Sequence, residues 1–427
     1  MRLSLVALCL FAACAAEPRW LKGNLHTHSL WSDGNDFPEV ITLWYKDRGY
    51  DFLAISDHNT LQEGERWMKV DDIVRRNART GVARYREQFG SDWVETRTKD
   101  GKLEVRLRPL DEYRVLLEEK GRFLIIQSEE ITDKFDKSEI HINATNIVER
   151  IEPKHGTSVR DVMRNNLRAV AEQSERLGQP IVAHLNHPNF RWSITAEDLA
   201  AVVEERFFEV YNGHPDTGHE GDETHASVEQ IWDIANTLRL AEMSAPPLFG
   251  LAVDDSHNYF NSTGSIPGRG WVMVRATELT PDAVCDSLAE GDFYASSGVQ
   301  LEEVQFADNV LSVQIRGEPG VSYRTEFRGT RRGYNRATAP VMQDGKEVKG
   351  VTMRYSSDVG EVFAVIEGER ATYRLSGDEL YVRAIVKSDK APEHPAFDGE
   401  MEQAWTQPVG WRWYLRGASS TSAGSAR

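Results

Sequence analysis

The segment Asp51-Phe-Leu-Ala-Ile-Ser-Asp-His58 contains the pattern from which the fold is predicted. Its apolar run is typical of a strand buried on both faces, and the run ends in an acid and an imidazole. Similar short apolar runs recur up to about residue 274 and alternate with amphipathic or charged stretches. Strand and helix alternation over this length favours an α/β barrel or a doubly wound parallel sheet. The other runs are residues 123–127, 181–184, 207–211 and 248–253.

Helix signals lie between these apolar runs. Asp36 and Pro38 suit the first turn of a helix that stops at Gly49. Residues 157–177 are followed by Gly178, a residue that commonly ends helices. Residues 226–240 carry apolar side chains at the spacing of one buried helix face. The sequence therefore predicts helices between successive strands.

The alternation defines the expected domains. Residues 17–299 form the predicted barrel, and residues 62–122 interrupt it with a highly charged stretch that we interpret as a helical insertion over one mouth of the barrel. Residues 300–416 contain short alternating runs broken by Gly and Asp, typical of a small β-rich accessory domain. Residues 417–427 are of low complexity, which predicts a disordered tail.

The first sixteen residues, MRLSLVALCLFAACAA, have the layout of a secretory signal peptide cleaved after Ala16. They predict a secreted or periplasmic protein. Lipid attachment at Cys14 is an alternative, because the residues before it fit a lipoprotein signal only in part. With Cys9 and Cys14 in the leader, the mature chain keeps only Cys285 and has no internal disulfide.

The composition excludes several classes of protein. The chain has 427 residues, of which 40% are hydrophobic and 27% charged, as in ordinary globular proteins. It has 50 Lys and Arg against 67 Asp and Glu, a formal net charge of −17, which argues against a nucleic-acid partner. No segment after the leader is apolar enough to span a bilayer.

The histidines are concentrated where predicted strands end. Eleven of the twelve fall between residues 26 and 257. In the first strand, Gly23-Asn-Leu-His-Thr-His-Ser29, the two-residue spacing of His26 and His28 lets both imidazoles bind one ion from the same face. A His-x-His pair alone is also found on solvated strand edges.

Further potential ligands follow the other strands. Each has an ordinary structural alternative, such as a turn, a loop residue or a hydrogen-bonded core histidine. The carboxyl ends of parallel strands converge, however, so together these residues predict a metal site. They are Asp33, Asp57, His58, Glu129 or Glu130, His141, His184 or His187, Asp255 and His257.

Other motifs are absent or misleading. His219-Glu-Gly-Asp-Glu-Thr-His225 is similar to a zinc-protease helix, but its histidines are six residues apart instead of four. The chain has no Gly-x-Ser-x-Gly elbow, P-loop or Gly-x-Gly-x-x-Gly. Serine hydrolases, P-loop nucleotide hydrolases and dinucleotide-binding enzymes therefore lose their usual support.

The ordered motifs resemble those of the PHP superfamily, named for polymerase and histidinol phosphatase. They are His-x-His followed by Ser-Asp-Gly, then Ser-Asp-His, a Glu at a strand end, a His, a His-Pro and an Asp-x-His. Asn24-Leu-His-Thr-His-Ser29 and the β-rich end look like the branch of carbaryl-hydrolase-type metallohydrolases. The resemblance covers about residues 22–275 and implies a distorted seven-stranded, TIM-like (β/α)7 barrel with two or three divalent metal ions.

The resemblance also implies which residues bind which metal. Glu130 is preferred to Glu129 because it matches the family's Glu-Ile pattern, and His187 to His184 because Pro188 follows it. Many members have a Gly before the bridging Glu, where this chain has Ser128-Glu129. The implied ligands are His26, His28, Glu130 and Asp255 for the first metal, Glu130, His141 and His187 for the second, and Asp33, His58 and His257 for the third.

These metals imply hydrolysis. Two or three cations lower the pKa of a bridging water, and the hydroxide formed attacks phosphorus or a carbonyl without a protein nucleophile. We expect Asp33 to take part in catalysis as well as in metal binding. Arg191 and His214 are candidates to bind the anionic oxygens of the substrate, although both also fit an ordinary surface ion pair and a loop histidine.

The predicted activity is a phosphoesterase that acts on a small molecule. The main alternative is hydrolysis of an amide or carbamate at the same metals, and a non-catalytic periplasmic metal-binding or ligand-binding protein is an alternative of another class. The mixed imidazole and carboxylate ligands accommodate Zn, Mn or Fe. The sequence leaves the metal, the substrate and the oligomeric state open.

Overall fold

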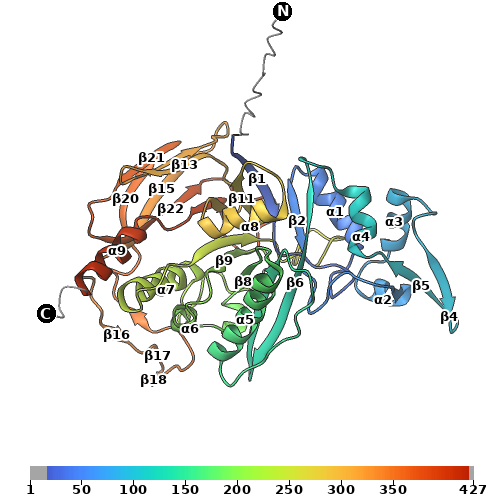
Figure 1. The fold of residues 1–427 in the computed structure, drawn as a ribbon, viewed down its shortest axis with the longest axis horizontal. Coiled ribbons are helices and arrows are strands. Elements are labelled where there is room, and N and C mark those ends of the chain that lie inside the picture. The colour runs from blue at the N-terminus through green and yellow to red at the C-terminus, as the bar shows by residue number, and fades with distance from the viewer. Residues whose placement is uncertain (1–16, 423–427) are drawn as a thin grey trace, which may run out of the picture.

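The chain forms a mixed α/β protein in the computed structural model, which describes residues 17–422 (Figure 1). A sheet of thirteen strands runs through it in the order β10-β9-β8-β7-β6-β2-β1-β11-β12-β23-β22-β15-β20. The predicted α/β class is confirmed in this form. The predicted signal peptide, residues 1–16, lies outside the described residues. No helix within residues 17–422 has the length and apolar character needed to cross a membrane.

Seven neighbouring strands form the part of the sheet that carries the predicted ligands. β1, β2 and β6 are parallel, as are β8, β9 and β10, whereas β7 is antiparallel to both β6 and β8. These strands are β1 (Arg19–Asn24), β2 (Phe52–Ile55), β6 (Leu124–Phe135), β7 (Ser138–Thr145), β8 (Val182–Leu185), β9 (Phe207–Asn212) and β10 (Phe249–Val253).

The antiparallel strand β7 departs from the parallel strands of the predicted (β/α)7 barrel. Phe135 pairs with Ser138, so only two residues join β6 to β7, and Asp136 has a positive φ of 54°. A connection this short can join only antiparallel strands, because a parallel pair needs a crossover of a dozen or more residues.

Backbone contacts bring the two ends of this seven-strand row together. Beyond β1 and β10, Thr27 and Ser256 form an isolated parallel bridge. The backbone N–H of His28 donates to the carbonyl of Ser256, and that of Asp255 donates to the carbonyl of His26, both at 3.0 Å. The row is thus linked at its ligand-bearing edge, while the closed (β/α)7 barrel stays a prediction.

Helices cover this part of the sheet. The ends of α5 match the sequence signals, whereas α1 begins after Phe37, and Asp36 is not its N-cap residue. Ser158 caps α5 by accepting a hydrogen bond from the N–H of Asp161, and Gly178 ends the helix in a left-handed conformation. Ser227 and Gln230 form a capping box at the start of α7, whose buried face packs in one core cluster with β9. The helices are α1 (Pro38–Asp47), α5 (Val159–Leu177), α6 (Ala196–Ala201), α7 (Val228–Glu242) and α8 (Pro281–Glu290), with a short 3-10 turn at Phe190–Trp192.

The sequence predicted a helical insertion at residues 62–122. The structure corrects this prediction, because the insertion also contains a three-stranded sheet. The hairpin between β4 and β5 turns at Asp100-Gly101, where both residues have positive φ. Asp-Gly is a strong signal for such a turn. The insertion projects from one end of the molecule (Figure 1). Its elements are β3 (Arg66–Lys69), α2 (Val70–Arg75), α3 (Gly81–Phe89), β4 (Thr96–Lys99), β5 (Lys102–Leu107) and α4 (Leu110–Leu117).

The β-rich region continues the main sheet, since β11 (Trp271–Ala276) pairs with β1, and β12 (Phe293–Ser296) pairs with β23. Helix α9 (Trp411–Ser422) extends into the segment expected to be disordered, and residues 423–427 lie outside the described part. The remaining strands are β13 (Leu301–Ala307), β14 (Val310–Ile315), β15 (Tyr323–Arg331), β16 (Thr338–Ala339), β17 (Met342–Gln343), β18 (Lys346–Glu347), β19 (Arg354–Tyr355), β20 (Glu361–Glu367), β21 (Arg370–Arg374), β22 (Glu379–Ser388) and β23 (Gln403–Thr406).

A buried ion pair joins helix α7 to this β-rich region. Asp233 Oδ1 accepts from Arg383 Nε at 2.9 Å, and Asp233 Oδ2 accepts from Arg383 Nη2 at 2.8 Å. The hydroxyl of Tyr381 donates to Asp233 Oδ1 at 2.7 Å. Both charged side chains are buried, so loss of Asp233 leaves the charge of Arg383 with only the longer contact to Glu229, at 3.7 Å.

We expect Asp233→Ala to lower the free energy of unfolding by about 3–5 kcal/mol, the usual cost of breaking a buried ion pair. Urea denaturation followed by circular dichroism measures this loss. Asp378→Ala is the control, because the pair between Asp378 and Arg331 is exposed and contributes at most about 1 kcal/mol. Equal losses in the two variants would contradict a structural role for the buried pair.

Candidate metal centre

Two imidazoles and two carboxylates form the centre of the site. His26 and His28 follow β1, and their Nε2 atoms are 3.0 Å apart. Asp255, which follows β10, has its Oδ1 atom 3.2 Å from both of these nitrogens. Glu130, in β6, has its Oε2 atom 3.6 Å from His26 Nε2 and 3.3 Å from His28 Nε2. Three distant segments thus surround one point with four potential ligand atoms.

Five of the six separations among these four atoms are close to those expected around a tetrahedral divalent cation. Ligand atoms about 2.1 Å from such a cation lie about 3.4 Å from one another, and the separations given above are 3.0 to 3.6 Å. All four residues are buried, and Glu130 Oε2 also lies 2.7 Å from Nδ1 of His58. Buried carboxylates are costly unless positive charge, on imidazoles or on a cation, compensates theirs. The residues therefore fit a metal ion here.

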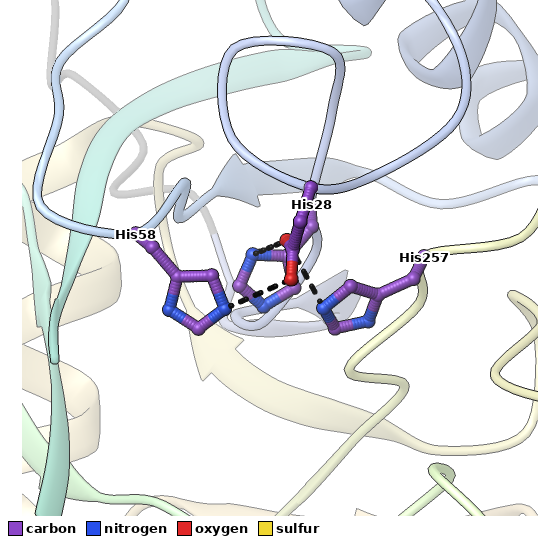
Figure 2. Close-up of side chains that lie close together, drawn as sticks. His28, His58 and His257 are labelled. Carbon is purple, nitrogen blue, oxygen red and sulfur yellow. Dashed lines mark ion pairs between the residues drawn. The ribbon is translucent and has the colours of Figure 1, made fainter. Parts of the chain in front are cut away.

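A second group lies around Asp33, nearer to the surface. Its Oδ1 atom is 3.3 Å from His257 Nε2, and its Oδ2 atom is 3.5 Å from His58 Nε2. Figure 2 shows the imidazoles of His28, His58 and His257 close together, on segments from different parts of the chain. The rings of His58 and His257 both stack on His28. His28 directs Nε2 to the first group, while its Nδ1 lies 3.7 Å from Asp33 Oδ1.

A third group uses the other oxygen of Glu130. Glu130 Oε1 is 2.9 Å from His141 Nδ1 and 3.7 Å from His187 Nε2. Asp255 Oδ2 lies 3.9 Å from His187 Nε2. Both ring nitrogens of His141 are buried without a hydrogen-bond partner in the described chain. The two oxygens of Glu130 therefore face different groups of imidazoles, the arrangement of a carboxylate that bridges two cations.

The structure separates the alternatives that the sequence left open. Glu129 points away from the cluster and accepts a hydrogen bond from the backbone N–H of Ile151. His184 Nε2 lies 3.3 Å from Glu209 Oε1, which accepts its hydrogen bond, whereas His187 lines the cavity beside Glu130. The geometry thus brings all nine predicted ligands together, and leaves Glu129 and His184 outside the three groups.

Asp57 supports the loop of Asp33 and is not among the potential ligands. Its carboxylate accepts hydrogen bonds from Ser29 N and Oγ, Ser32 Oγ and Gln62 Nε2 at 2.6 to 2.8 Å.

Gly34 ends this loop in contact with the backbone of His28. A Cβ added at Gly34 would lie 2.5 Å from the His28 carbonyl oxygen. Glycine is therefore required in the Ser-Asp-Gly motif.

Glu209 is a positioning residue that the sequence reasoning missed. Its Oε1 atom lies 2.6 Å from His26 Nδ1, which leaves Nε2 of that ring directed at the cluster. Its Oε2 atom accepts from the backbone N–H of His187 at 2.7 Å and from Asn212 Nδ2 at 2.8 Å. The signal was present, because Glu209 is the one charged residue in the apolar strand Phe207-Phe-Glu-Val-Tyr211.

Carboxylates and imidazoles in the cluster shift the pKa values of one another. Burial raises the pKa of the Glu130 carboxyl, but the nearby imidazoles outweigh burial and hold this pKa well below its ordinary value. Burial lowers the pKa of His58, while the carboxylates of Glu130 and Asp33 raise it to about 11. The carboxylates are thus ionised at neutral pH. Cations bound among them would replace protons on the imidazoles.

A cavity of about 590 Å³ opens above the three groups. Arg191 lines it, with a side chain that is 64% exposed and an Nη1 atom 2.8 Å from Glu139 Oε1. His214 also lines it, and its Nδ1 accepts the backbone N–H of Asp216 at 3.1 Å. None of the described residues in 62–122 lines this cavity, so the insertion does not form its walls.

The comparisons with known proteins found only distant likenesses. No protein-family model and no curated protein matches the chain. One solved structure is a two-domain protein containing a predicted PHP-like metal-dependent phosphoesterase, from Bacteroides vulgatus. It is 14% identical over 91% of this chain and 95% of its own, with a TM-score of 0.40.

A second solved structure is a candidate metal-dependent phosphoesterase from Bifidobacterium adolescentis. It is 15% identical over 64% of this chain and 96% of its own, with a TM-score of 0.29. Both likenesses are too distant to decide the function, which is therefore argued from the chain's own residues. Membership of the PHP superfamily, and of its carbaryl-hydrolase-type branch, stays a prediction.

We expect Glu130→Gln to hold at least one fewer divalent metal ion per chain than the natural protein, because it removes the charge that faces two ligand groups. Elemental analysis of the purified variant measures this content. Glu129→Gln is the matched control, since the neighbouring carboxylate points away from the cluster and its loss leaves the metal content unchanged. Equal metal contents in the two variants would remove Glu130 from the metal centre.

We expect Glu209→Gln to weaken metal affinity about 10- to 100-fold, the usual effect of removing a carboxylate that orients a metal-binding imidazole. Competition against a chromogenic chelator measures the affinity. Glu205→Gln is the control, because this buried carboxylate binds backbone N–H groups at the start of β9 and does not contact the cluster. An unchanged affinity in Glu209→Gln would show that His26 needs no such support.

Proposed function

We propose that the protein is a metal-dependent hydrolase of the PHP type that acts on a phosphate ester of a small molecule. The observation that carries the proposal is the position of Glu130, whose two oxygens face separate groups of imidazoles at the floor of one cavity. The proposed ligands are His26, His28, Asp33, His58, Glu130, His141, His187, Asp255 and His257, which would hold two or three ions of Zn, Mn or Fe.

Divalent cations bound at these positions would lower the pKa of a bound water molecule. They would also offset the negative charge that develops on the oxygens of the substrate. The residues of the chain support the use of water as the nucleophile. None of the described residues that line the cavity is a Ser, Thr, Cys or Lys. Hydroxyl, thiol and amine nucleophiles are therefore missing from these walls, and most of the carboxylates and imidazoles there are the proposed metal ligands.

Asp33 supports the reaction as an ionised carboxylate. Burial raises the pKa of its carboxyl, but hydrogen bonds to His257 and His58 lower this pKa far below its ordinary value. Asp33 therefore remains an acceptor at neutral pH. Its side chain is 56% exposed, so both the second group of imidazoles and the substrate can reach it.

Arg191 and His214 are suited to hold the oxygens of the substrate. Burial lowers the pKa of His214, so its ring is neutral at neutral pH. Because its Nδ1 accepts the N–H of Asp216, the proton is on Nε2, where it can be donated to a phosphate oxygen. Arg191 supplies a cationic donor on the same cavity wall, which favours an anionic substrate over a neutral carbamate.

The proposal includes export and the expected division of the chain. The leader at residues 1–16 supports a secreted or periplasmic location, with lipid attachment at Cys14 as the alternative. The hydrolase would occupy residues 17–299, and the β-rich residues 300–416 would support it through the shared sheet.

We expect the metal-loaded protein to hydrolyse a nitrophenyl phosphate monoester or diester faster than an aryl carbamate. Asp255→Asn should lower turnover by about 10³-fold or more, because metals supply several kcal/mol of charge stabilisation. The release of nitrophenol or aryl alcohol measures the rates, and circular dichroism checks the fold of the variant.

Faster carbamate cleavage would instead favour the amide or carbamate hydrolase. An inactive protein with its full complement of metals would favour the non-catalytic binding protein.

A further inference from the structure

A second cavity lies on the other side of the segment that carries Asp255 and His257. Its volume is about 610 Å³, close to that of the cavity above the metal centre, and the two share no lining residue. The walls come from both parts of the molecule. Lys22, Trp44, Tyr50 and Trp271 lie on the side of the predicted hydrolase, and residues 392–394 lie on the β-rich side.

Lys22 is a half-buried charged residue in this wall. Its Nζ atom lies 4.0 Å from the centre of the Tyr50 ring and 3.9 Å from that of the Trp271 ring. In residues 17–422 no carboxylate is within salt-bridge distance of this nitrogen, and no hydrogen bond to it is formed. Burial lowers the pKa of Lys22 to about 8, so the ammonium is still mostly charged at neutral pH.

The two carboxylates that raise the pKa of Lys22 already accept hydrogen bonds from other groups. Asp51 accepts hydrogen bonds from Arg19 Nη1 and from the backbone N–H of Lys22. Asp254 accepts from Tyr45 and from the backbone N–H groups of residues 268–270. The charge of Lys22 thus has only aromatic faces as direct partners within the described chain.

Two more donors beside Lys22 lack acceptors. The hydroxyl of Tyr50 and the indole N–H of Trp271 are buried and have no hydrogen-bond partner among the described residues. The two side chains are 3% and 7% exposed, and both line the cavity. Buried donors in native proteins nearly always find an acceptor, so two unpaired donors next to an unpaired ammonium indicate a missing ligand that carries acceptors.

The rest of the cavity suits a flat apolar body. Trp44, Tyr259 and Phe260 add aromatic surface to the rings of Tyr50 and Trp271. Planar rings stack on such surfaces at little entropic cost. Among the other charges in the walls, Arg48 and Arg269 add to the charge of Lys22. Of the two acids there, Glu402 pairs with Lys390 at 3.2 Å, and the side chain of Glu393 is 91% exposed to solvent.

We propose that this cavity is a second binding site, separate from the metal centre, for a small organic anion with an aromatic ring. The anionic group accepts hydrogen bonds from Lys22 Nζ and from the donors of Tyr50 and Trp271, and the ring lies against the aromatic walls. The site needs no metal and stands independently of the proposed phosphoesterase activity.

Titration calorimetry of the full-length, metal-loaded protein with benzenesulfonate tests the site, because a sulfonate coordinates metals weakly. We expect saturable binding of one benzenesulfonate per chain. Methanesulfonate, which lacks the ring, and benzyl alcohol, which lacks the charge, should bind at least about tenfold more weakly.

Lys22→Met should weaken benzenesulfonate binding at least about tenfold, because it keeps the side-chain length and removes the charge. Trp271→Phe keeps a ring and removes only the N–H, and should weaken binding several-fold. Lys120→Met is the matched control, since Lys120 is exposed outside the cavity. Melting curves of each variant check the fold.

Glu130→Gln should bind benzenesulfonate as the natural protein does, because Glu130 belongs to the other cavity. Binding that is absent from the natural protein, or unchanged in both Lys22→Met and Trp271→Phe, would overturn the proposal. Binding lost in Glu130→Gln and kept in Lys22→Met would assign the anion to the metal centre and would overturn it equally.

Discussion

The candidate site depends on the backbone contacts that join the segments after β1 and β10. The bridge between Thr27 and Ser256, with its hydrogen bonds at His28 and Asp255, fixes the first and last strands of the seven-strand row at one edge. Ligands more than 200 residues apart in sequence thereby come within 3.2 Å of each other. Asp255 has a left-handed φ of 49°, a conformation that costs free energy and is retained at sites where neighbouring structure demands it.

The second constraint is electrostatic. Glu130, Asp255 and Glu209 are buried within a few Å of several imidazoles, and such a group of acids is stable only with compensating positive charge. Protons on the imidazoles supply that charge in part, and divalent cations at the proposed ligands would supply it more completely. A cation that binds only the folded chain would also stabilise the fold by mass action. The same residues would thus couple metal binding to folding.

The sequence predicted which residues lie close together better than it predicted the fold around them. Strand-end positions single out His26, His58 and Asp255, because the ends of parallel strands converge, although each residue alone has an ordinary structural alternative. Glu209 was missed because it lies inside its strand, where its contact with His26 depends on tertiary packing. The sheet of the insertion was missed although Asp100-Gly101 signals its hairpin. The pairing of β12 with β23 joins segments over a hundred residues apart, which local patterns do not encode.

Asp254 lies in a segment that contributes to both cavities, since Asp255 and His257 line the first and the residues from Asn258 line the second. Its neighbour Asp255 faces the imidazoles, while Asp254 accepts hydrogen bonds from three successive backbone N–H groups of residues 268–270 and from Tyr45. These contacts hold the start of β11, and with it Trp271, at a fixed position relative to the metal centre. The carboxylate is buried, and its charge also raises the pKa of Lys22, which burial lowers. Most of the proposed metal ligands therefore line one cavity, and Lys22 with the unpaired donors of Tyr50 and Trp271 lines the other.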